Sequence, residues 1–95
     1  MTVHWTRTAL RQLSAVYDYI AQHSERYARR MVDRITRRSE EIGRFPHLGW
    51  AVAEYDCDEI REVLERPYRI IYRIRADRID VIAVIHAARQ LPERL

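Results

Sequence analysis

Two segments decide the fold of this chain: Tyr68-Arg69-Ile70-Ile71-Tyr72-Arg73-Ile74 and, after a short turn, Ile79-Asp80-Val81-Ile82-Ala83-Val84-Ile85-His86. In the first segment arginines alternate with aromatic or aliphatic residues, which is the two-residue period of a β-strand. The second is apolar at nearly every position, as in a strand covered on both faces. With a further segment at 60–64 and short turns between the three, they predict an antiparallel meander with strands at 60–64, 68–75 and 78–86.

The N-terminal half has the helical period instead. Thr6 or Thr8 can cap a first helix, and Ser24 can cap a second. Gly43 is expected to end the second helix. A short strand at 3–5 precedes them, so the predicted order is β-α-α-β-β-β. This is an α+β fold in which a helical hairpin packs on a small antiparallel sheet.

The segment that follows the helices is unusually apolar for a loop: Phe45-Pro46-His47-Leu48-Gly49-Trp50. We expect Phe45, Leu48 and Trp50 to pack over one end of the helices, because large apolar side chains are usually buried. Residues 51–58 show no regular period and are expected to be irregular.

Length and composition limit the kind of protein. The chain has 95 residues, of which 47% are hydrophobic and 33% are charged. This predicts one globular domain spanning residues 1–95. No apolar run approaches the roughly 18 residues of a membrane-spanning helix. Residues 1–5 lack the basic and apolar regions of a signal peptide, so we expect a cytoplasmic protein with no membrane partner.

Residues suited to covalent catalysis or metal binding are few and scattered. Cys57 is the only cysteine, and the acids beside it disfavour its thiolate form. The four histidines lack the spacing of metal ligands, and two glycines are too few for a phosphate-binding loop. We therefore predict no cofactor, no metal and no definite catalytic group. One set of side chains could in principle perform phosphodiester chemistry: His86, Arg69, Arg73 and Tyr72. A lone histidine at a strand end, however, is more often a structural hydrogen-bonding group.

The positive charge is carried by arginine alone. All 17 basic residues are arginine, and the net charge is +3. The guanidinium group is planar, permanently charged and suited to carboxylates and phosphates. On the second helix four arginines recur at a spacing of four: Arg26, Arg30, Arg34 and Arg38. This arginine ridge is either an ordinary solvated face or a surface for an acidic partner.

The two faces of the sheet differ in character. Alternation in the strand at 68–75 places Tyr68, Ile70, Tyr72 and Ile74 beneath the helices, and Arg69, Ile71, Arg73 and Arg75 on the other face. The helices can cover only one face, so the tail or a partner chain must cover the other. We predict a binding surface there, with an apolar centre rimmed by cations: Ile71, Ile82 and Val84 inside Arg61, Arg69, Arg73, His86 and Arg89. The alternative is that residues 87–95 fold back and hide the apolar part.

Several short motifs follow one another along the chain. They are Phe45-Pro46-x-x-Gly49 after the hairpin, Ile60-Arg61-Glu62, the two segments quoted first, and Leu91-Pro92 in the tail. Their order and spacing resemble those of the RelE/ParE toxins along essentially the whole chain. The segment His86-Ala87-Ala88-Arg89-x-Leu91-Pro92 most resembles the ParE branch.

The resemblance implies a bacterial type II toxin that arrests growth and is neutralised by a cognate antitoxin encoded beside it. The C-terminal segment of the antitoxin would wrap around the toxin in a hetero-oligomer and cover its helices and part of its sheet. ParE-type toxins inhibit DNA gyrase and so block replication. RelE-type toxins instead cut mRNA in the ribosomal A site, using cationic residues on the sheet and a tyrosine in the tail.

The RelE resemblance implies that three residues of this chain lie at or near the cationic positions of the RelE site: Arg61, Arg69 and Arg89. Two departures weigh against cleavage: the chain has no lysine, and it has no tyrosine after Tyr72. We therefore expect a gyrase inhibitor that is not an enzyme. A ribosome-dependent endoribonuclease and a degenerate, non-toxic module that binds an antitoxin remain the alternatives.

Overall fold

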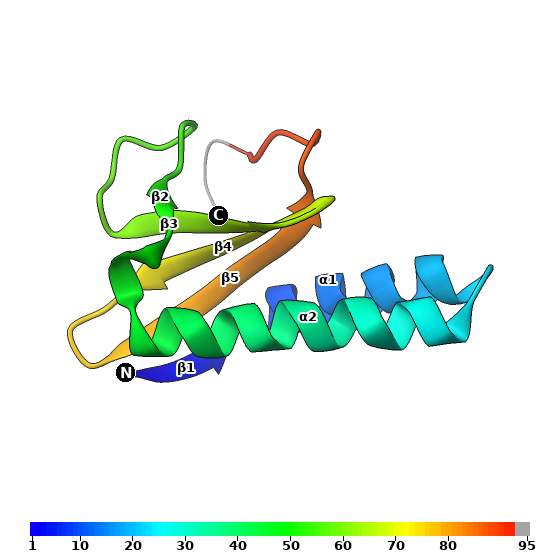
Figure 1. Cartoon of the computed structure of the whole chain (residues 1–95). Coiled ribbons are helices and arrows are strands. Elements are labelled where there is room, and N and C mark those ends of the chain that lie inside the picture. The colour runs from blue at the N-terminus through cyan, green and yellow to red at the C-terminus, as the bar shows by residue number, and fades with distance from the viewer. Residues whose placement is uncertain (93–95) are drawn as a thin grey trace.

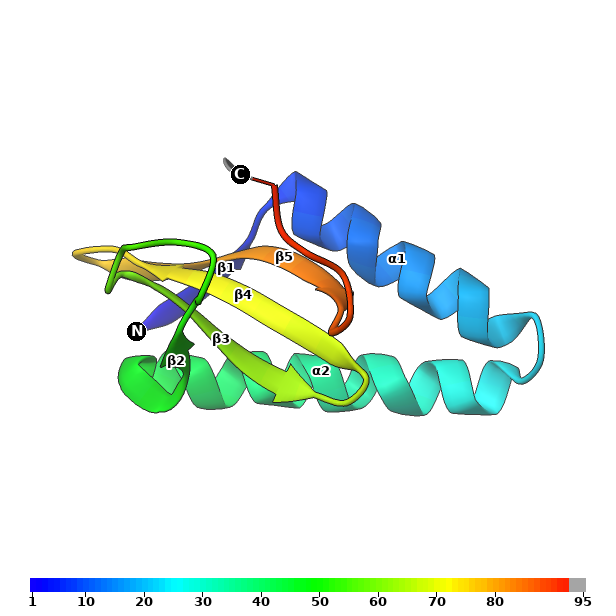
Figure 2. The same cartoon turned by 90° about the horizontal axis from the view of Figure 1, so that it is seen from above.

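The computed structural model describes residues 1–92 and contains two helices and five strands (Figure 1). The elements in chain order are β1 (Thr2–Trp5), α1 (Arg7–Ala21), α2 (Glu25–Arg44), a 3₁₀ turn η1 (Pro46–Leu48), β2 (Trp50–Ala51), β3 (Ile60–Glu65), β4 (Tyr68–Ile74) and β5 (Arg78–His86). Both helices lie against one face of the sheet, and Figure 2 shows that they diverge from the turn that joins them. This confirms the predicted α+β fold of a helical hairpin on a sheet. The predicted order β-α-α-β-β-β, however, lacks β2, whose Ala51 was expected to be irregular and instead pairs with Arg61. Neither helix is both long enough and apolar enough to cross a membrane.

The sheet is mixed, not purely antiparallel. Its strand order is β1-β5-β4-β3-β2, and the β3-β4-β5 meander is antiparallel as predicted. β1, however, pairs parallel with β5, with Val3 opposite Ile79. A parallel pair needs a long connection between its strands, which both helices and the meander supply here.

Side-chain caps fix the start of each helix. The Thr6 hydroxyl accepts a hydrogen bond from the Ala9 amide at 3.1 Å, and the Ser24 hydroxyl accepts one from the Tyr27 amide at 3.2 Å. Both satisfy amides that the first helical turn leaves without partners. The caps confirm the predicted starts.

The predicted end of the second helix at Gly43 is wrong, because α2 continues through Arg44. Gly43 is a helical residue over which β1 passes closely. A Cβ atom at this position would lie 2.8 Å from Val3 Cγ2 and 2.9 Å from the Met1 carbonyl oxygen. Glycine is therefore needed here for a close approach and not for the helix end.

The apolar loop after α2 does not pack over the helices as expected. Phe45, Leu48 and Trp50 are 62%, 41% and 77% exposed. The backbone of this turn is anchored instead. The buried Tyr72 hydroxyl donates to the Pro46 carbonyl at 2.6 Å and accepts from the Gly49 amide at 2.9 Å. Because these two bonds position the turn, its apolar side chains are left outside.

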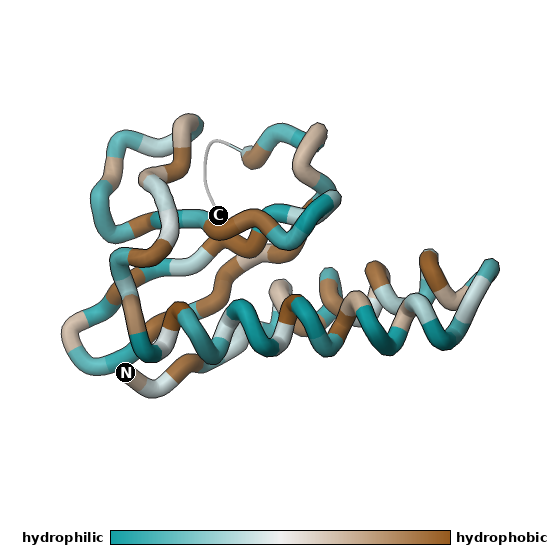
Figure 3. Tube along the Cα trace, viewed as in Figure 1, coloured by the Kyte–Doolittle hydropathy of each residue, from teal (hydrophilic) through white to brown (hydrophobic). Residues whose placement is uncertain are grey.

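Each face of the sheet has its own apolar core. Figure 3 shows the hydropathy along the chain, with hydrophobic stretches in the strands and alternating hydrophilic and hydrophobic residues along α2. The larger core lies beneath the helices, and its most buried members include Ile35, Ile42, Ile70 and Tyr72. The smaller core lies on the opposite face and is formed by Val52, Ile71, Ala83, Ile85 and Leu91. Leu91 belongs to the tail, so the alternative that the tail folds back over this face is confirmed as far as residue 92, and residues 93–95 lie outside the described part of the chain.

A β-bulge in β5 changes which face of the sheet its later side chains occupy. Ile71 lies opposite Ala83, whereas the next residue, Tyr72, lies opposite Val81, which leaves Ile82 as the extra residue. An extra residue moves every later side chain to the other face. Val84 therefore packs beneath the helices and not on the open face, so its predicted exposure there is wrong. Ile71 does face the open side, but it is fully buried by the tail and the 52–55 segment.

Candidate functional site

The central feature of the open face is a buried arginine held by two carboxylates. Arg69, only 7% exposed, donates to both oxygens of Glu54 at 2.9 Å, through Nη1 and Nη2. Its Nε donates to Glu62 Oε2 at 3.0 Å, and Nη2 bonds the same oxygen. A planar guanidinium that meets one carboxylate with two parallel bonds is the strongest geometry for such a pair. We call Arg69, Glu54 and Glu62 the Arg69 cluster.

The Arg69 cluster also fastens the tail to the sheet. Arg69 Nη1 donates to the Arg89 carbonyl at 3.2 Å, and the Leu91 amide donates to Glu54 Oε2 at 3.2 Å. Beside it, the Tyr55 hydroxyl donates to the Pro92 carbonyl at 2.6 Å. The cluster therefore joins β4, β3, the 52–55 segment and the tail.

The electrostatics of the Arg69 cluster are those of a closed ion pair. Hydrogen bonds from Arg69 lower the pKa of Glu54 from its ordinary value of 4.5 to about 2, against the opposing effect of burial. The same bonds raise the pKa of Arg69 above its ordinary value. Both groups are thus charged at neutral pH, and each compensates the other.

We expect the pairing of Glu54 with Arg69 to make the stability of the fold sensitive to acid. A carboxyl whose pKa is depressed in the folded state stabilises the fold above its unfolded value of 4.5, and this stabilisation is lost as the pH falls toward about 2. After allowance for partial exposure, the pairing of Glu54 should account for about 1–2 kcal/mol of the stability lost between roughly pH 7 and pH 3. Urea unfolding of the native chain and of Glu54→Gln at both pH values measures this share. An equal loss in the two proteins would contradict it.

Arg61 does not join the other arginines. It lies opposite Tyr72 in the β3–β4 pairing, so it shares the face of Tyr72, while Arg69 occupies the other face. Its guanidinium donates to two backbone carbonyls, those of Gly49 at 3.0 Å and Asp58 at 3.0 Å. The predicted rim that combined Arg61 with Arg69 is therefore wrong. The β3 side chain beside Arg69 is Glu62.

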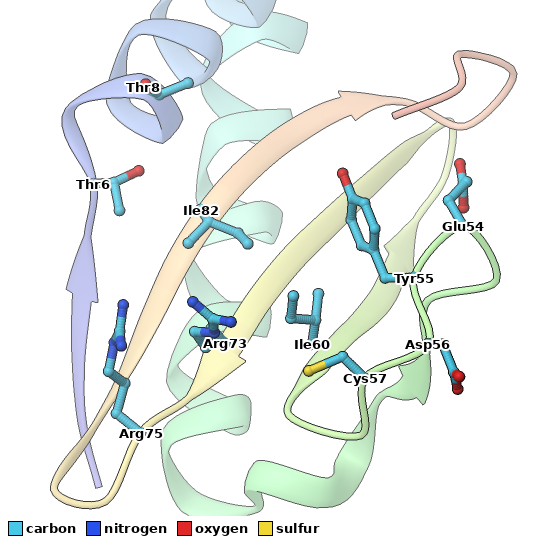
Figure 4. Close-up of a pocket in the computed structure, with 10 residues that line it drawn as sticks. All are labelled: Thr6, Thr8, Glu54, Tyr55, Asp56, Cys57, Ile60, Arg73, Arg75 and Ile82. Atoms are coloured by element: carbon cyan, nitrogen blue, oxygen red, sulfur yellow. The ribbon is translucent and has the colours of Figure 1, made fainter. Parts of the chain in front are cut away.

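The remaining predicted site residues do not lie together. His86 is opposite Tyr68 in the β4–β5 pairing and shares its helix-side face, so its predicted place on the rim of the open face is wrong. Arg73 is half-buried and lies toward the β4–β5 turn, next to Ile82 in a hollow of the surface (Figure 4). His86 and the Arg89 side chain are exposed at the opposite end of β5, where the His86 ring meets the ring of Tyr68 edge-on at 6.0 Å. The expected set of His86, Arg69, Arg73 and Tyr72 is not assembled, since Tyr72 lies under the helices.

The arginine ridge on α2 is partly occupied by acids of this chain. Arg34 pairs with Glu65 at 3.4 Å and Arg38 with Glu41 at 3.2 Å. Arg26 and Arg30 are exposed, and neither forms an ion pair within residues 1–92. The N-terminal half of the ridge is therefore the part available to a partner.

Sequence reasoning missed the carboxylates that hold Arg69. Glu62 could have been found, because correct pairing of the two strands puts it diagonally across from Arg69. Glu54 lies in a segment without a period, so nothing in the sequence placed it. Within the described residues, no group of three or more histidine, cysteine or acidic side chains is arranged to hold a metal ion.

Comparison with known proteins agrees with this architecture. Residues 3–91 match the family model described as "ParE toxin of type II toxin-antitoxin system, parDE". Toxin RelE2 of Caulobacter vibrioides is 33% identical over 87 residues, which cover 92% of this chain and 96% of that protein. A structure of the chromosomal ParDE toxin-antitoxin system from P. aeruginosa superposes with a TM-score of 0.74 at 25% identity, covering 90% of this chain and 95% of that one.

A second structure, the YoeB/ParE toxin from Agrobacterium tumefaciens, shares the fold, with a TM-score of 0.64 at 19% identity over 90% of this chain and 98% of that one. The fold, together with the family match and the relative at 33% identity, defines a toxin of the RelE/ParE superfamily. The chain belongs to the family of ParE toxins of type II toxin-antitoxin systems. Membership of this family implies a cognate antitoxin as partner.

Proposed function

We propose that this toxin arrests growth by binding and inhibiting DNA gyrase in the cytoplasm, and not by cutting RNA. The observation that carries the proposal is the Arg69 cluster. Arg69 is the position that the RelE resemblance would make catalytic, yet it is buried and neutralised by Glu54 and Glu62. A guanidinium whose donors are already occupied by two carboxylates is not available to stabilise charge on a phosphate.

The positions of Arg61 and Arg89 also support a function other than RNA cleavage. Arg61 lies on the helix-side face and is bound to backbone carbonyls, while the Arg89 side chain is exposed at the other end of the sheet. The three arginines therefore share no common centre in which a phosphodiester could be held. The match to the ParE family model over residues 3–91 supports the same function.

A ribosome-dependent endoribonuclease is the second candidate, and one observation favours it. The similar protein from Caulobacter vibrioides is named Toxin RelE2. Induction of the toxin in a bacterial host separates the candidates. We expect growth arrest with induction of the DNA-damage response and with intact mRNA. Arrest with mRNA cut within codons would instead establish the endoribonuclease. No arrest at all would indicate a degenerate module that only binds its antitoxin.

We further propose that the antitoxin lies along the free end of the arginine ridge with an acidic segment. Charge reversal at both free positions, Arg26→Glu with Arg30→Glu, should weaken the toxin–antitoxin complex about 10- to 100-fold, because it replaces attraction by repulsion. The matched control is Arg7→Glu with Arg11→Glu, two exposed arginines on α1. Titration calorimetry at two salt concentrations measures both variants. Equal affinities for the two double variants would contradict the assignment of the ridge.

A further inference from the structure

A hollow of the open face lies beside the Arg69 cluster and shares Glu54 with it. It has a volume of about 740 Å³ and lies between the start of α1 and the 54–57 segment (Figure 4). Thr6 and Thr8 border it on one side and Tyr55 and Cys57 on the other, with Ile82 between them. Arg73, at the end of β4, points into it. This volume is within the range of about 300–1,000 Å³ typical of small-molecule sites. We call it the Arg73 hollow.

Arg73 differs from the two other arginines on this face. Arg69 is paired with Glu54 and Glu62, and Arg75 donates to Asp80 at 2.8 Å. Arg73 has no carboxylate partner in residues 1–92, and its Nε is buried without any hydrogen-bond partner. A buried donor without a partner is costly, and such groups commonly mark the place of a bound ion, ligand or water. The hollow therefore contains a guanidinium that forms no ion pair with a carboxylate of residues 1–92.

The surrounding donors favour an oxyanion with several acceptor atoms. Arg75 contributes its two terminal nitrogens, because only its Nε bonds Asp80. The Thr6 hydroxyl lies on the far side of Ile82 and points toward it, whereas the Thr8 hydroxyl points away from the hollow (Figure 4). Donors that approach from different directions match a tetrahedral phosphate, whose oxygens accept all round, better than a carboxylate, which accepts in one plane.

We propose that the Arg73 hollow binds a phosphate group, carried either by a free nucleotide or by a nucleic-acid strand. Arg73 and Arg75 bind the phosphate oxygens, and Ile60 with Ile82 forms an apolar floor for the rest of the ligand. Asp80, opposite Arg73 in the β4–β5 pairing, is bound by Arg75 and Arg78. Of the two acids that border the hollow, Glu54 is paired with Arg69, and Asp56 is exposed to solvent on the far wall. Neither faces Arg73 closely enough to pair with it.

The first test observes Arg73 directly. In the full chain, the NMR signal of the Arg73 Nε–H group should shift on addition of inorganic phosphate. Arg73→Gln should raise the dissociation constant about tenfold or more, Arg73→Lys less, and the exposed control Arg30→Gln not at all. Acetate should bind at least about tenfold more weakly than phosphate. No shift, equal binding by Arg73→Gln, or equal binding of acetate would overturn the proposal.

The second test uses Cys57, the only cysteine, as a reporter within the hollow. Alkylation of Cys57 by iodoacetamide should be slowed by adenosine 5′-monophosphate but not by adenosine, and this protection should be lost in Arg73→Gln. A short single-stranded DNA without terminal phosphates identifies the source of the phosphate. Protection by this DNA assigns the site to a nucleic-acid strand, and protection by the nucleotide alone assigns it to a free nucleotide. Protection by neither would contradict the site, whatever the outcome of the gyrase experiment.

Discussion

Arg69→Ala is expected to destabilise the folded chain by about 3–5 kcal/mol, the range found when one partner of a buried ion pair is removed. The substitution leaves Glu54 and Glu62 facing each other without the cation that both contact. It also removes the hydrogen bond to the Arg89 carbonyl, which helps to hold the tail over the smaller core. Urea unfolding at neutral pH measures the loss.

A triple variant separates the ion pairing from the packing of the side chain. Arg69→Met with Glu54→Gln and Glu62→Gln keeps the volume and removes all three charges, so it should recover most of the lost stability. The exposed control Arg30→Ala should change stability by less than about 0.5 kcal/mol. A loss below about 1 kcal/mol in Arg69→Ala would mean that the pair is open to solvent and that Arg69 could act on a substrate.

Gly49→Ala is expected to cost about 2–3 kcal/mol, as typical of overpacking at a site that cannot relax. An added Cβ would lie 2.5 Å from the Glu62 carbonyl oxygen and 2.7 Å from the Tyr72 hydroxyl. The backbone torsions at Gly49 are ordinary, with φ −80° and ψ 169°, so the cost arises from contact and not from strain. Thermal or urea unfolding of the variant gives the value.

Tyr72→Phe is the matched control for Gly49→Ala. Alone it should cost about 1–3 kcal/mol, because the Gly49 amide loses its acceptor in a buried site. In combination with Gly49→Ala it relieves the contact with the hydroxyl but not the contact with the Glu62 backbone. The double variant should therefore remain less stable than Tyr72→Phe. Equal stability of the two would show that the β3 backbone yields at Gly49.

The sequence was sufficient wherever a local pattern has one structural solution. The Thr6 and Ser24 caps and the alternation in β4 predicted the hairpin, the meander and the face of each β4 side chain. β5 is different, because residues 81–85 are apolar throughout. A bulge at Ile82 leaves no mark in such a run, so the side on which Val84 lies could not be read from it.

Contacts between segments distant in the sequence could not be predicted either. The burial of Arg69 depends on Glu54, which lies in an irregular loop 15 residues earlier. The exposure of Trp50 depends on the hydrogen bonds of Tyr72 to the preceding turn. Composition predicted arginines suited to carboxylates and phosphates but could not say which arginine meets which group. The fold pairs Arg69 with two carboxylates and leaves Arg73 without one.

We propose that this toxin acts on gyrase as a binding protein. The most direct measurement adds the purified toxin to purified gyrase, ATP and relaxed plasmid, with the toxin–antitoxin complex as control. We predict loss of supercoiling, or accumulation of cleaved plasmid, at toxin concentrations stoichiometric with gyrase, and no effect of the complex. Unchanged supercoiling at excess toxin, together with cleavage of mRNA on purified ribosomes, would rule out gyrase as the target.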